Sequence, residues 1–96
     1  MTCTLSPRAR ADLVEIGDYI AHDNPGRAAT FIAELRAHCV HLAEFPASAQ
    51  RRPDIDPEIR IAPHAGYIIC YETTDRGIHI VRIVSGRRFL PVLLDR

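Results

Sequence analysis

The sequence predicts an α+β domain in which a helical hairpin packs on a small, mainly antiparallel sheet, with the element order β-α-α-β-β-β. Three observations favour this fold. Two amphipathic segments with helix start signals occupy about residues 6–45. Three runs of β-branched and aromatic residues, separated by short turn-forming segments, occupy residues 59–88. A short β-prone segment at residues 2–5 precedes the helices and is expected to form an edge strand.

The two helices carry clear start signals. Ser6 is a favourable N-cap, and Pro7 at the first helical position has no amide hydrogen to leave unpaired. Asn24-Pro25 repeats the signal for a second helix, and so short a connection predicts antiparallel neighbours. Gly17 lies on the apolar face of the first helix, where it costs roughly 1 kcal/mol of helix propensity relative to alanine. We expect it to permit close approach by the second helix.

The rest of the chain divides into a linker, a sheet and a tail. Residues 46–58 hold three prolines and two adjacent arginines, and are expected to form a polar linker without an element of its own. The strands of 59–88 are broken around His64-Ala65-Gly66 and Thr74-Asp75-Arg76-Gly77. Residues 89–96 form an apolar tail.

Alternation along the last strand predicts the faces of its side chains. It places Arg82 on the same face as Ile78 and Ile80. His79, Val81 and Ile83 point the opposite way. Both faces then carry apolar side chains, although a short helical hairpin covers only one. We therefore expect the surplus apolar surface to meet a protein partner.

Composition bounds the class of protein. A chain of 96 residues is long enough for one domain with one modest core. It has no apolar run of about 20 residues and no signal peptide, so we expect a cytoplasmic protein without a membrane partner. The formal net charge is zero, with an excess of two positive charges in residues 49–96, where eight arginines face six acids. This balance argues against direct sequence-specific binding of nucleic acid.

The cysteines predict neither a cofactor nor a metal site. Cys3, Cys39 and Cys70 contain no C-x-x-C pair, and we interpret them as free thiols and small core residues. The nearest metal-ligand candidate is the run from His38 to His41. On a helix its two histidines diverge and Cys39 turns inward, which favours an ordinary helix surface.

The sequence resembles the ParE toxins of the RelE/ParE superfamily over nearly its whole length. The segments that carry the resemblance are Leu5-Ser6-Pro7-Arg8-Ala9, Asp12-Leu13, Asp18-Tyr19-Ile20, Asn24-Pro25, Phe31-Ile32, Leu42-Ala43-Glu44-Phe45-Pro46, Gly66-Tyr67-Ile68-Ile69-Cys70-Tyr71 and Ile80-Val81-Arg82-Ile83-Val84-Ser85-Gly86-Arg87-Arg88. The resemblance implies the RelE/ParE-like fold, in agreement with the element order above.

The resemblance also implies a function. It implies the toxin of a type II toxin–antitoxin system, of the kind linked to plasmid stabilisation. Such a toxin inhibits DNA gyrase by binding, and a ParD-like antitoxin neutralises it in a hetero-oligomer. Two alternatives stay open, because a shared fold does not choose between functions. One is a RelE-like, ribosome-dependent mRNA endonuclease, and the other is a non-toxic binding module of the antitoxin complex.

The residues favour binding over catalysis. RNA cleavage by the ribose 2′-hydroxyl needs a base, an acid and cations for the phosphorane charge. The resemblance to RelE-like nucleases would place these groups at Ile59, Ile61, Ile68, Arg88 and near Leu94. Of these side chains only the arginine has suitable chemistry, so we expect no enzymatic activity.

Other acids and bases are available, but packing or a polar turn explains them more simply. They are His64, His79, Tyr67, Tyr71 and Glu72.

The candidate contacts to a target are arginines at the end of the sheet. Arg87 and Arg88 follow the last strand, and Arg60 and Arg82 would extend the patch if they lie on its face. Guanidinium groups suit carboxylates and phosphates. We therefore expect them to meet an acidic patch of gyrase, the DNA it holds, or antitoxin carboxylates.

Overall fold

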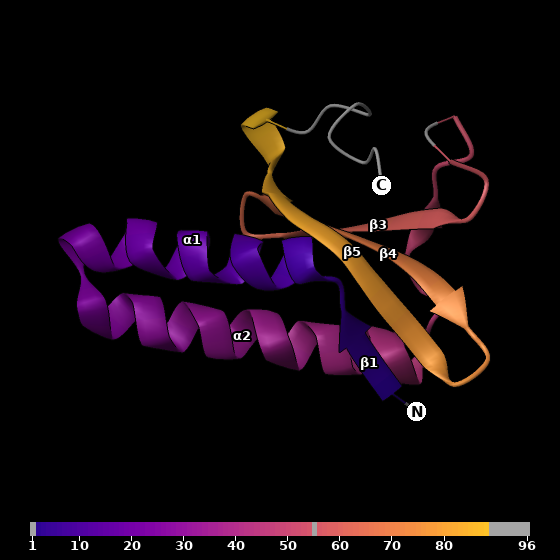
Figure 1. Ribbon diagram of the computed structural model, residues 1–96, viewed down its shortest axis with the longest axis horizontal. Coiled ribbons are helices and arrows are strands. Elements are labelled where there is room, and N and C mark those ends of the chain that lie inside the picture. Colours follow the sequence, from indigo (N-terminus) through magenta and orange to yellow (C-terminus); the bar gives the residue numbers. More distant parts are fainter. Residues whose placement is uncertain (1, 55, 89–96) are drawn as a thin grey trace.

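The computed structural model describes residues 2–54 and 56–88, and shows two helices packed on one face of a five-stranded sheet (Figure 1). The predicted α+β fold is confirmed, while the predicted tail, 89–96, lies outside the described residues. The strand order is β1-β5-β4-β3-β2. The elements are β1 (Thr2–Leu5), α1 (Pro7–Asp23), α2 (Pro25–Glu44), β2 (Gln50–Arg51), β3 (Ile59–His64), β4 (Tyr67–Thr74), β5 (Gly77–Ser85) and the 3₁₀ turn η1 (Gly86–Arg88).

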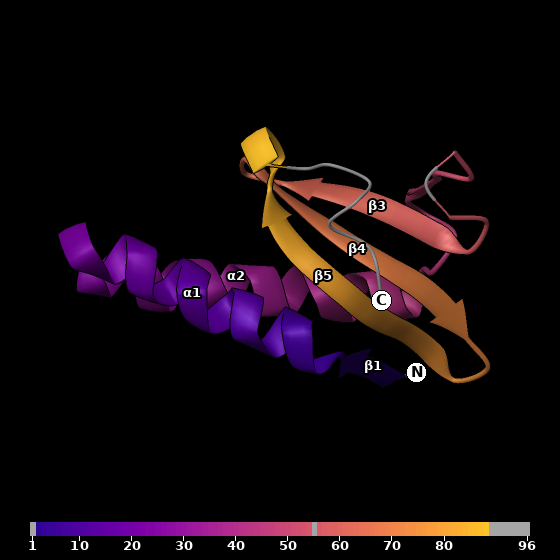
Figure 2. The ribbon, with the colours of Figure 1, turned by 45° about the horizontal axis from the view of Figure 1, so that its top comes forward.

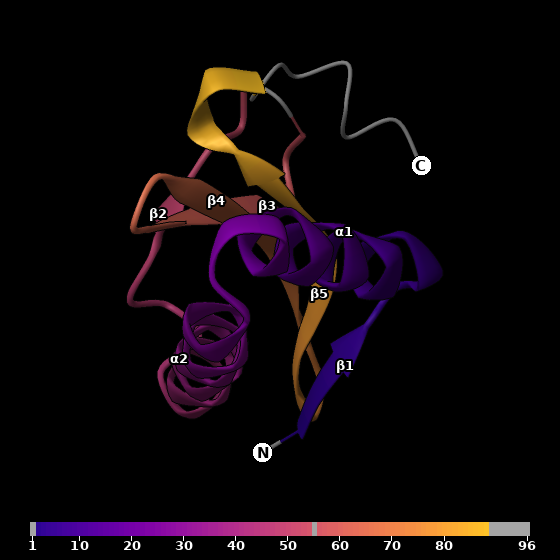
Figure 3. The ribbon, with the colours of Figure 1, turned by 90° about the vertical axis from the view of Figure 1, so that its left-hand side faces the viewer.

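Side-chain caps define the helical hairpin. The Ala9 amide donates to Ser6 Oγ at 3.0 Å, and the Arg27 amide donates to Asn24 Oδ1 at 3.0 Å. The backbone amide of Asn24 also donates to the Ile20 carbonyl at 2.9 Å, so this single residue ends α1 and caps α2. The helices therefore turn back on each other at once and lie side by side (Figure 3). Neither described helix is long and apolar enough to span a membrane.

The expected reason for Gly17 is wrong. A Cβ atom at this position would lie 3.6 Å from Cγ1 of Ile32, which is ordinary van der Waals contact. The hairpin thus has room for a methyl group here, and glycine is not required for the two helices to pack.

The sheet is mixed because the last strand, β5, lies parallel beside the first strand, β1. β1 pairs parallel with β5, from Thr2 opposite Gly77 to Leu5 opposite Ile80, and all other neighbours are antiparallel. The predicted linker also contains β2, which pairs with β3 in antiparallel register. The expectation that 46–58 forms no element is wrong for those two residues, because the outer edge of β3 offers unpaired backbone groups even to a polar chain.

A bulge interrupts β5 where it crosses the middle of β4. Cys70 pairs with Arg82, whereas the next residue of β4, Tyr71, pairs with Ile80. Val81 is therefore an extra residue on the longer strand, as in a β-bulge.

The bulge changes which side chains of β5 share a face. Ile78, Ile80 and Ile83 all belong to the core cluster between the sheet and the helices. Strict alternation had placed Ile83 on the opposite face with Val81. That prediction is wrong because one inserted residue reverses the inward and outward positions that follow it.

Apolar side chains fill both faces of the sheet. The main core lies between the sheet and the hairpin and includes Leu35 and Tyr71, both 0% exposed. On the other face Ile59, Cys70 and Val81, from three adjacent strands, form a second buried cluster. The burial of this cluster differs from the bare strand face that the sequence predicts. Among the described residues, the large exposed apolar side chains are Val14, Tyr19, Val40 and Phe45, on or directly after the two helices.

Candidate functional site

A groove of about 420 Å³ lies between α1 and the end of β5. Figure 2 shows α1 next to β5, with β4 and then β3 on the opposite side of β5. The side chains of the groove mix both charges with aromatic rings: Asp12, Glu15, Tyr19, Tyr67, Arg82 and Arg87. Two of the four predicted arginines, Arg82 and Arg87, therefore meet in one place.

Arg82 is held by a nearly buried carboxylate. Its Nε donates to Asp12 Oδ2 at 2.8 Å and its Nη2 donates to Asp12 Oδ1 at 3.0 Å. Their side chains are only 13% and 8% exposed. The hydrogen bond from Arg82 to this carboxylate raises the guanidinium pKa. Asp12 Oδ2 also accepts the backbone amide of Ile83 at 2.9 Å. Arg82 thus fastens α1 to β5, and its charge is largely satisfied within the fold.

Arg87 differs from Arg82 in its exposure. It lies in η1, just after the strand, with an exposed side chain on the rim of the groove. The preceding residue anchors the turn, because the Gly86 amide donates to the Gly66 carbonyl at 2.8 Å. The double arginine therefore does not continue β5, which ends at Ser85. The side chain of Arg88 lies outside the described part of the structure.

Arg60 lies apart from the groove. It is on β3, where its Nη1 donates to the Ala49 carbonyl at 2.7 Å in a partly buried contact. Its pairing partner, Tyr71, is four residues along β4 from Tyr67, which lines the groove. Four residues of strand span about 13 Å. The predicted patch of four arginines is therefore divided, and Arg60 serves to hold the loop after α2.

The positions implied for nuclease chemistry are apolar and well packed. Ile59 is 0% exposed in the second cluster, and Ile61 and Ile68 pack against that cluster half-buried. None of these side chains can accept a proton or bind a phosphate. Leu94, the remaining apolar position, lies outside the described residues.

A pair of histidines next to the groove was missed from the sequence. His64 is the last residue of β3, not a turn residue, and its Nδ1 lies 2.9 Å from Nδ1 of His38 on α2. One ring donates this hydrogen bond and the other accepts it. Burial, and secondly the neighbouring His64, lower the pKa of His38. The sequence could have shown this only through the length of the turn between β3 and β4. The turn holds the two residues Ala65 and Gly66, whereas a three-residue turn would have included His64, and the residue pattern does not distinguish the two.

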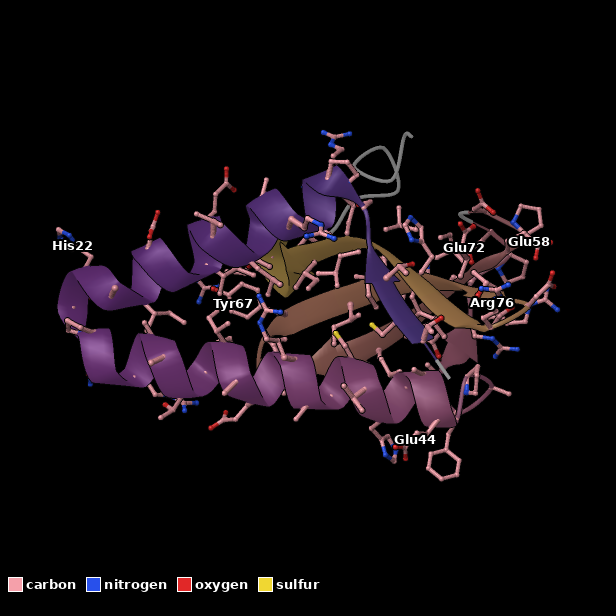
Figure 4. The ribbon with its side chains drawn as sticks, turned by 60° about the horizontal axis from the view of Figure 1, so that its bottom comes forward. His22, Glu44, Glu58, Tyr67, Glu72 and Arg76 are labelled. Atoms are coloured by element: carbon pink, nitrogen blue, oxygen red, sulfur yellow. The ribbon has the colours of Figure 1, made fainter. Side chains whose placement is uncertain are left out.

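Aromatic rings connect the histidine pair with the groove. The ring of Phe31 meets His64 edge-on at 5.6 Å between centroids and Tyr67 at the same distance. The guanidinium of Arg27 lies 5.2 Å above the Phe31 ring. Figure 4 shows Tyr67 where the sheet reaches the hairpin, so it borders both features. The arrangement offers exposed positive charge, stacking surfaces and one hydrogen-bonded imidazole pair within a small area.

The remaining titratable candidates have structural partners. Nδ1 of His79 lies 2.8 Å from Oγ1 of Thr4, which links β5 to β1. The hydroxyl of Tyr71 donates to the Pro46 carbonyl at 2.8 Å from within the core. Within residues 2–54 and 56–88 no three His, Cys, Asp or Glu side chains are grouped to hold a metal ion.

Comparison with known proteins agrees with the fold and the family that the sequence resembles. Residues 4–89 match the model of the ParE toxin of the type II toxin–antitoxin system parDE. Toxin RelE2 of Caulobacter vibrioides is 36% identical over 81 residues, which cover 84% of this chain and 90% of that toxin. A solved structure described as the chromosomal ParDE TA system from P. aeruginosa has a TM-score of 0.75 at 22% identity, covering 88% of this chain and 95% of that one.

These findings define the class as toxins of type II toxin–antitoxin systems. Since the family model spans nearly the whole chain, the protein belongs to the ParE toxin family. The predicted resemblance is therefore confirmed. The distant solved structure supports the same fold.

Proposed function

We propose that this ParE-family protein acts in the cytoplasm by binding DNA gyrase, without catalysis of its own. The observation that carries the proposal is the packing at the positions implied for nuclease chemistry. Ile59, Ile61 and Ile68 pack in or against a buried apolar cluster, where a reacting phosphate would find neither a proton donor nor a cation.

Arg87 is the first candidate contact to the target. It is exposed on the rim of the groove, whereas Arg82 below it is already paired with Asp12. A guanidinium that keeps its fork of donors exposed can bind a carboxylate or a phosphate in bidentate fashion. Arg88 is the second candidate, from its position in η1.

A supercoiling assay tests the proposal. Purified protein should inhibit gyrase or trap its cleaved DNA, and Arg87→Ala together with Arg88→Ala should weaken the inhibition by at least tenfold, or about 1.4 kcal/mol. Arg76→Ala is the matched control, because Arg76 is exposed in the β4–β5 turn at the far end from Tyr67 (Figure 4). Normal supercoiling at saturating protein would refute gyrase as the target.

We also propose a ParD-like antitoxin as the neutralising partner. The exposed apolar side chains on the hairpin, Val14, Tyr19, Val40 and Phe45, suit a partner segment that folds as it binds. The arginines at the groove suit acidic residues in that segment. Co-expression with the product of the adjacent reading frame should give a stable complex and restore growth, and separate elution of the two proteins would contradict the proposal.

The histidine pair keeps a second function open, that of a ribosome-dependent mRNA endonuclease. His38 and His64 form a hydrogen-bonded imidazole pair, a chemistry suited to proton transfer near neutral pH. This function predicts transcript cleavage in a translation extract, lost in His64→Ala and in Arg88→Ala. Intact transcripts at a concentration that inhibits gyrase would exclude it. If induction of the protein alone leaves growth unchanged and neither assay responds, the non-toxic binding module remains.

A further inference from the structure

Two cysteines distant in the sequence meet between β1 and α2. Cys3 is on the edge strand and Cys39 is on the inward face of α2, and Cys3 packs against the core cluster that contains Cys39. Both also line one small hollow of about 120 Å³ at the junction of β1 with the hairpin. The contact follows from the fold, since α2 packs against β1 in the main core. The sequence had indicated only separate free thiols.

The two thiols have different environments. Cys3 is half-buried, whereas Cys39 is only 5% exposed. The hydrogen bond from Cys39 lowers the pKa of Cys3 to about 7. The same hydrogen bond and burial raise the pKa of Cys39. A lowered pKa gives Cys3 a substantial thiolate fraction near neutral pH, whereas Cys39 stays a thiol. A partly accessible, partly ionised cysteine beside a buried thiol is the arrangement of a reactive cysteine with a resolving partner.

We propose that Cys3 and Cys39 form a redox modification site that hydroperoxides convert into an intramolecular disulfide. This inference is independent of the proposed target, because the thiols lie on the β1 side of the hairpin and not in the groove at the end of β5. Val40, one of the exposed residues proposed to meet the antitoxin, lines the same hollow, so the test uses the protein without a partner.

The reaction balances with a hydroperoxide as the two-electron oxidant. The Cys3 thiolate attacks a peroxide oxygen, the O–O bond breaks, and the leaving oxygen takes a proton from solvent, which leaves Cys3 as a sulfenic acid. Cys39 then loses its proton and attacks the Cys3 sulfur. The S–O bond breaks, and the departing hydroxide leaves as water with that proton.

The first step prepares the second. The hydrogen bond to Cys3, burial and the negative charge of Cys3 all raise the pKa of Cys39. A sulfenic acid at Cys3 is neutral, so the hydrogen bond to the thiolate and its charge are gone and Cys39 loses its proton more easily. The positive charge of nearby Arg36, which lines the same hollow, also favours the Cys39 thiolate. Sulfur atoms in a disulfide lie about 2 Å apart. Because both side chains already line one small hollow, the disulfide would join residues that are neighbours in the folded chain.

The disulfide would fasten β1 to α2 and enclose α1 in a covalent loop. A loop of this size restricts the unfolded chain, so oxidation should raise the melting temperature by on the order of 10 °C. Cys70 provides the internal control. It is 0% exposed in the second cluster, and burial raises its pKa to about 12, so peroxide should leave it unmodified.

The test uses the reduced, full-length protein treated with hydrogen peroxide and analysed by intact mass and peptide mapping without reductant. We expect a loss of two hydrogen atoms and a cross-link between the tryptic peptide that ends at Arg8 and the one that begins at Ala37. Dithiothreitol should reverse both the mass change and the rise in melting temperature. A wild-type chain that keeps both thiols, or that forms only intermolecular disulfides, would overturn the proposal.

Three variants separate the role of Cys3, which reacts with peroxide, from the role of Cys39, which closes the disulfide. Cys70→Ala should form the same disulfide at the same rate as the wild type. Cys39→Ala should stop at the sulfenic acid of Cys3, which a 1,3-dione reagent traps, and should form it more slowly than the wild type because the hydrogen bond that lowers the pKa of Cys3 is lost. Cys3→Ser should form neither product. If peroxide oxidised Cys39 in Cys3→Ser as fast as it oxidises the wild type, Cys3 would not be the reacting thiol and the mechanism would be refuted.

Discussion

Asp12 is the residue on which the join between α1 and β5 depends. Its carboxylate accepts two hydrogen bonds from Arg82 and one from the Ile83 amide, all at 3.0 Å or less. Past Ile80, β1 no longer covers that edge of β5. A side chain from α1 therefore satisfies a backbone amide that would otherwise be exposed on a strand edge.

Asp12→Asn should lower the free energy of unfolding by about 3 kcal/mol, because it leaves the largely buried Arg82 charge without its counter-ion. Urea denaturation measures the change. The matched control is Asp54→Asn at the Arg52–Asp54 pair, whose side chains are 31% and 61% exposed. That substitution should cost less than about 1 kcal/mol. Equal effects would contradict a structural role for the Asp12–Arg82 pair.

The histidine pair makes stability depend on pH. The pKa of His38 is lowered in the folded state by burial, by His64 and by His41, from an ordinary value of 6.5. Below that value the unfolded chain binds more protons at this position than the folded chain, so the free energy of unfolding decreases as the pH is lowered. Above 6.5 the contribution to stability is fully present.

Thermal unfolding between about pH 8 and about pH 5 should show this loss, and His38→Gln should flatten the slope. His22→Gln is the control, because His22 is exposed at the far end of α1. An unchanged slope in His38→Gln would show that the pair does not carry the effect.

At the scale of the elements, β1 and the bulge in β5 decide the shape of the sheet. β1 fits beside β5 only because Gly77, at the start of that strand, has no side chain. Its φ is +150°, and a Cβ atom there would collide with the backbone of Thr2. The bulge then directs Ile83 toward the helices while leaving Arg82 opposite Cys70. The groove thus depends on these two local departures from regular strand pairing.

Gly77→Ala should release the first residues of β1 and lower the free energy of unfolding by about 1–3 kcal/mol. Hydrogen exchange should report the change at the Thr2 amide, which donates to the Arg76 carbonyl at 2.7 Å. Gly26→Ala, in the first turn of α2, is the control, since the nearest atom to its added Cβ would be Oδ1 of the N-cap Asn24 at 3.6 Å. We expect it to be neutral or stabilising. Unchanged protection at Thr2 in Gly77→Ala would refute the steric argument.

At the scale of the molecule, the hairpin and the sheet share one core. Tyr71 joins them directly, because it is 0% exposed and its hydroxyl holds the Pro46 carbonyl at the end of α2. Tyr71→Phe keeps the packing and removes this hydrogen bond, so it should cost about 1 kcal/mol in equilibrium unfolding. Tyr19→Phe, at a position 77% exposed, should stay within about 0.5 kcal/mol. A neutral Tyr71→Phe would show that the loop needs no such anchor.

Local chemistry explains which features were predictable. The caps Ser6 and Asn24 act within three residues, so the bounds of the hairpin followed from the sequence. The bulge was not predictable, since no glycine or proline follows Gly77 within β5 to mark it, and the extra residue is defined only by its pairing with β4. The arginine patch divided for the same reason. Arg60 and Arg82 look alike in sequence, but each is held by a group that only the folded chain brings near.

The sequence by itself determined the α+β class, the helical hairpin, the family and the absence of proton-transfer groups at Ile59, Ile61 and Ile68. These depend on residue type and on spacing along the chain. Tertiary structure alone decided that Arg87 faces the groove and that His38 meets His64. It also brought Cys3 to Cys39. Each of these contacts joins segments that the sheet register and the packing of α2 bring together, and no local pattern encodes a distance across the fold.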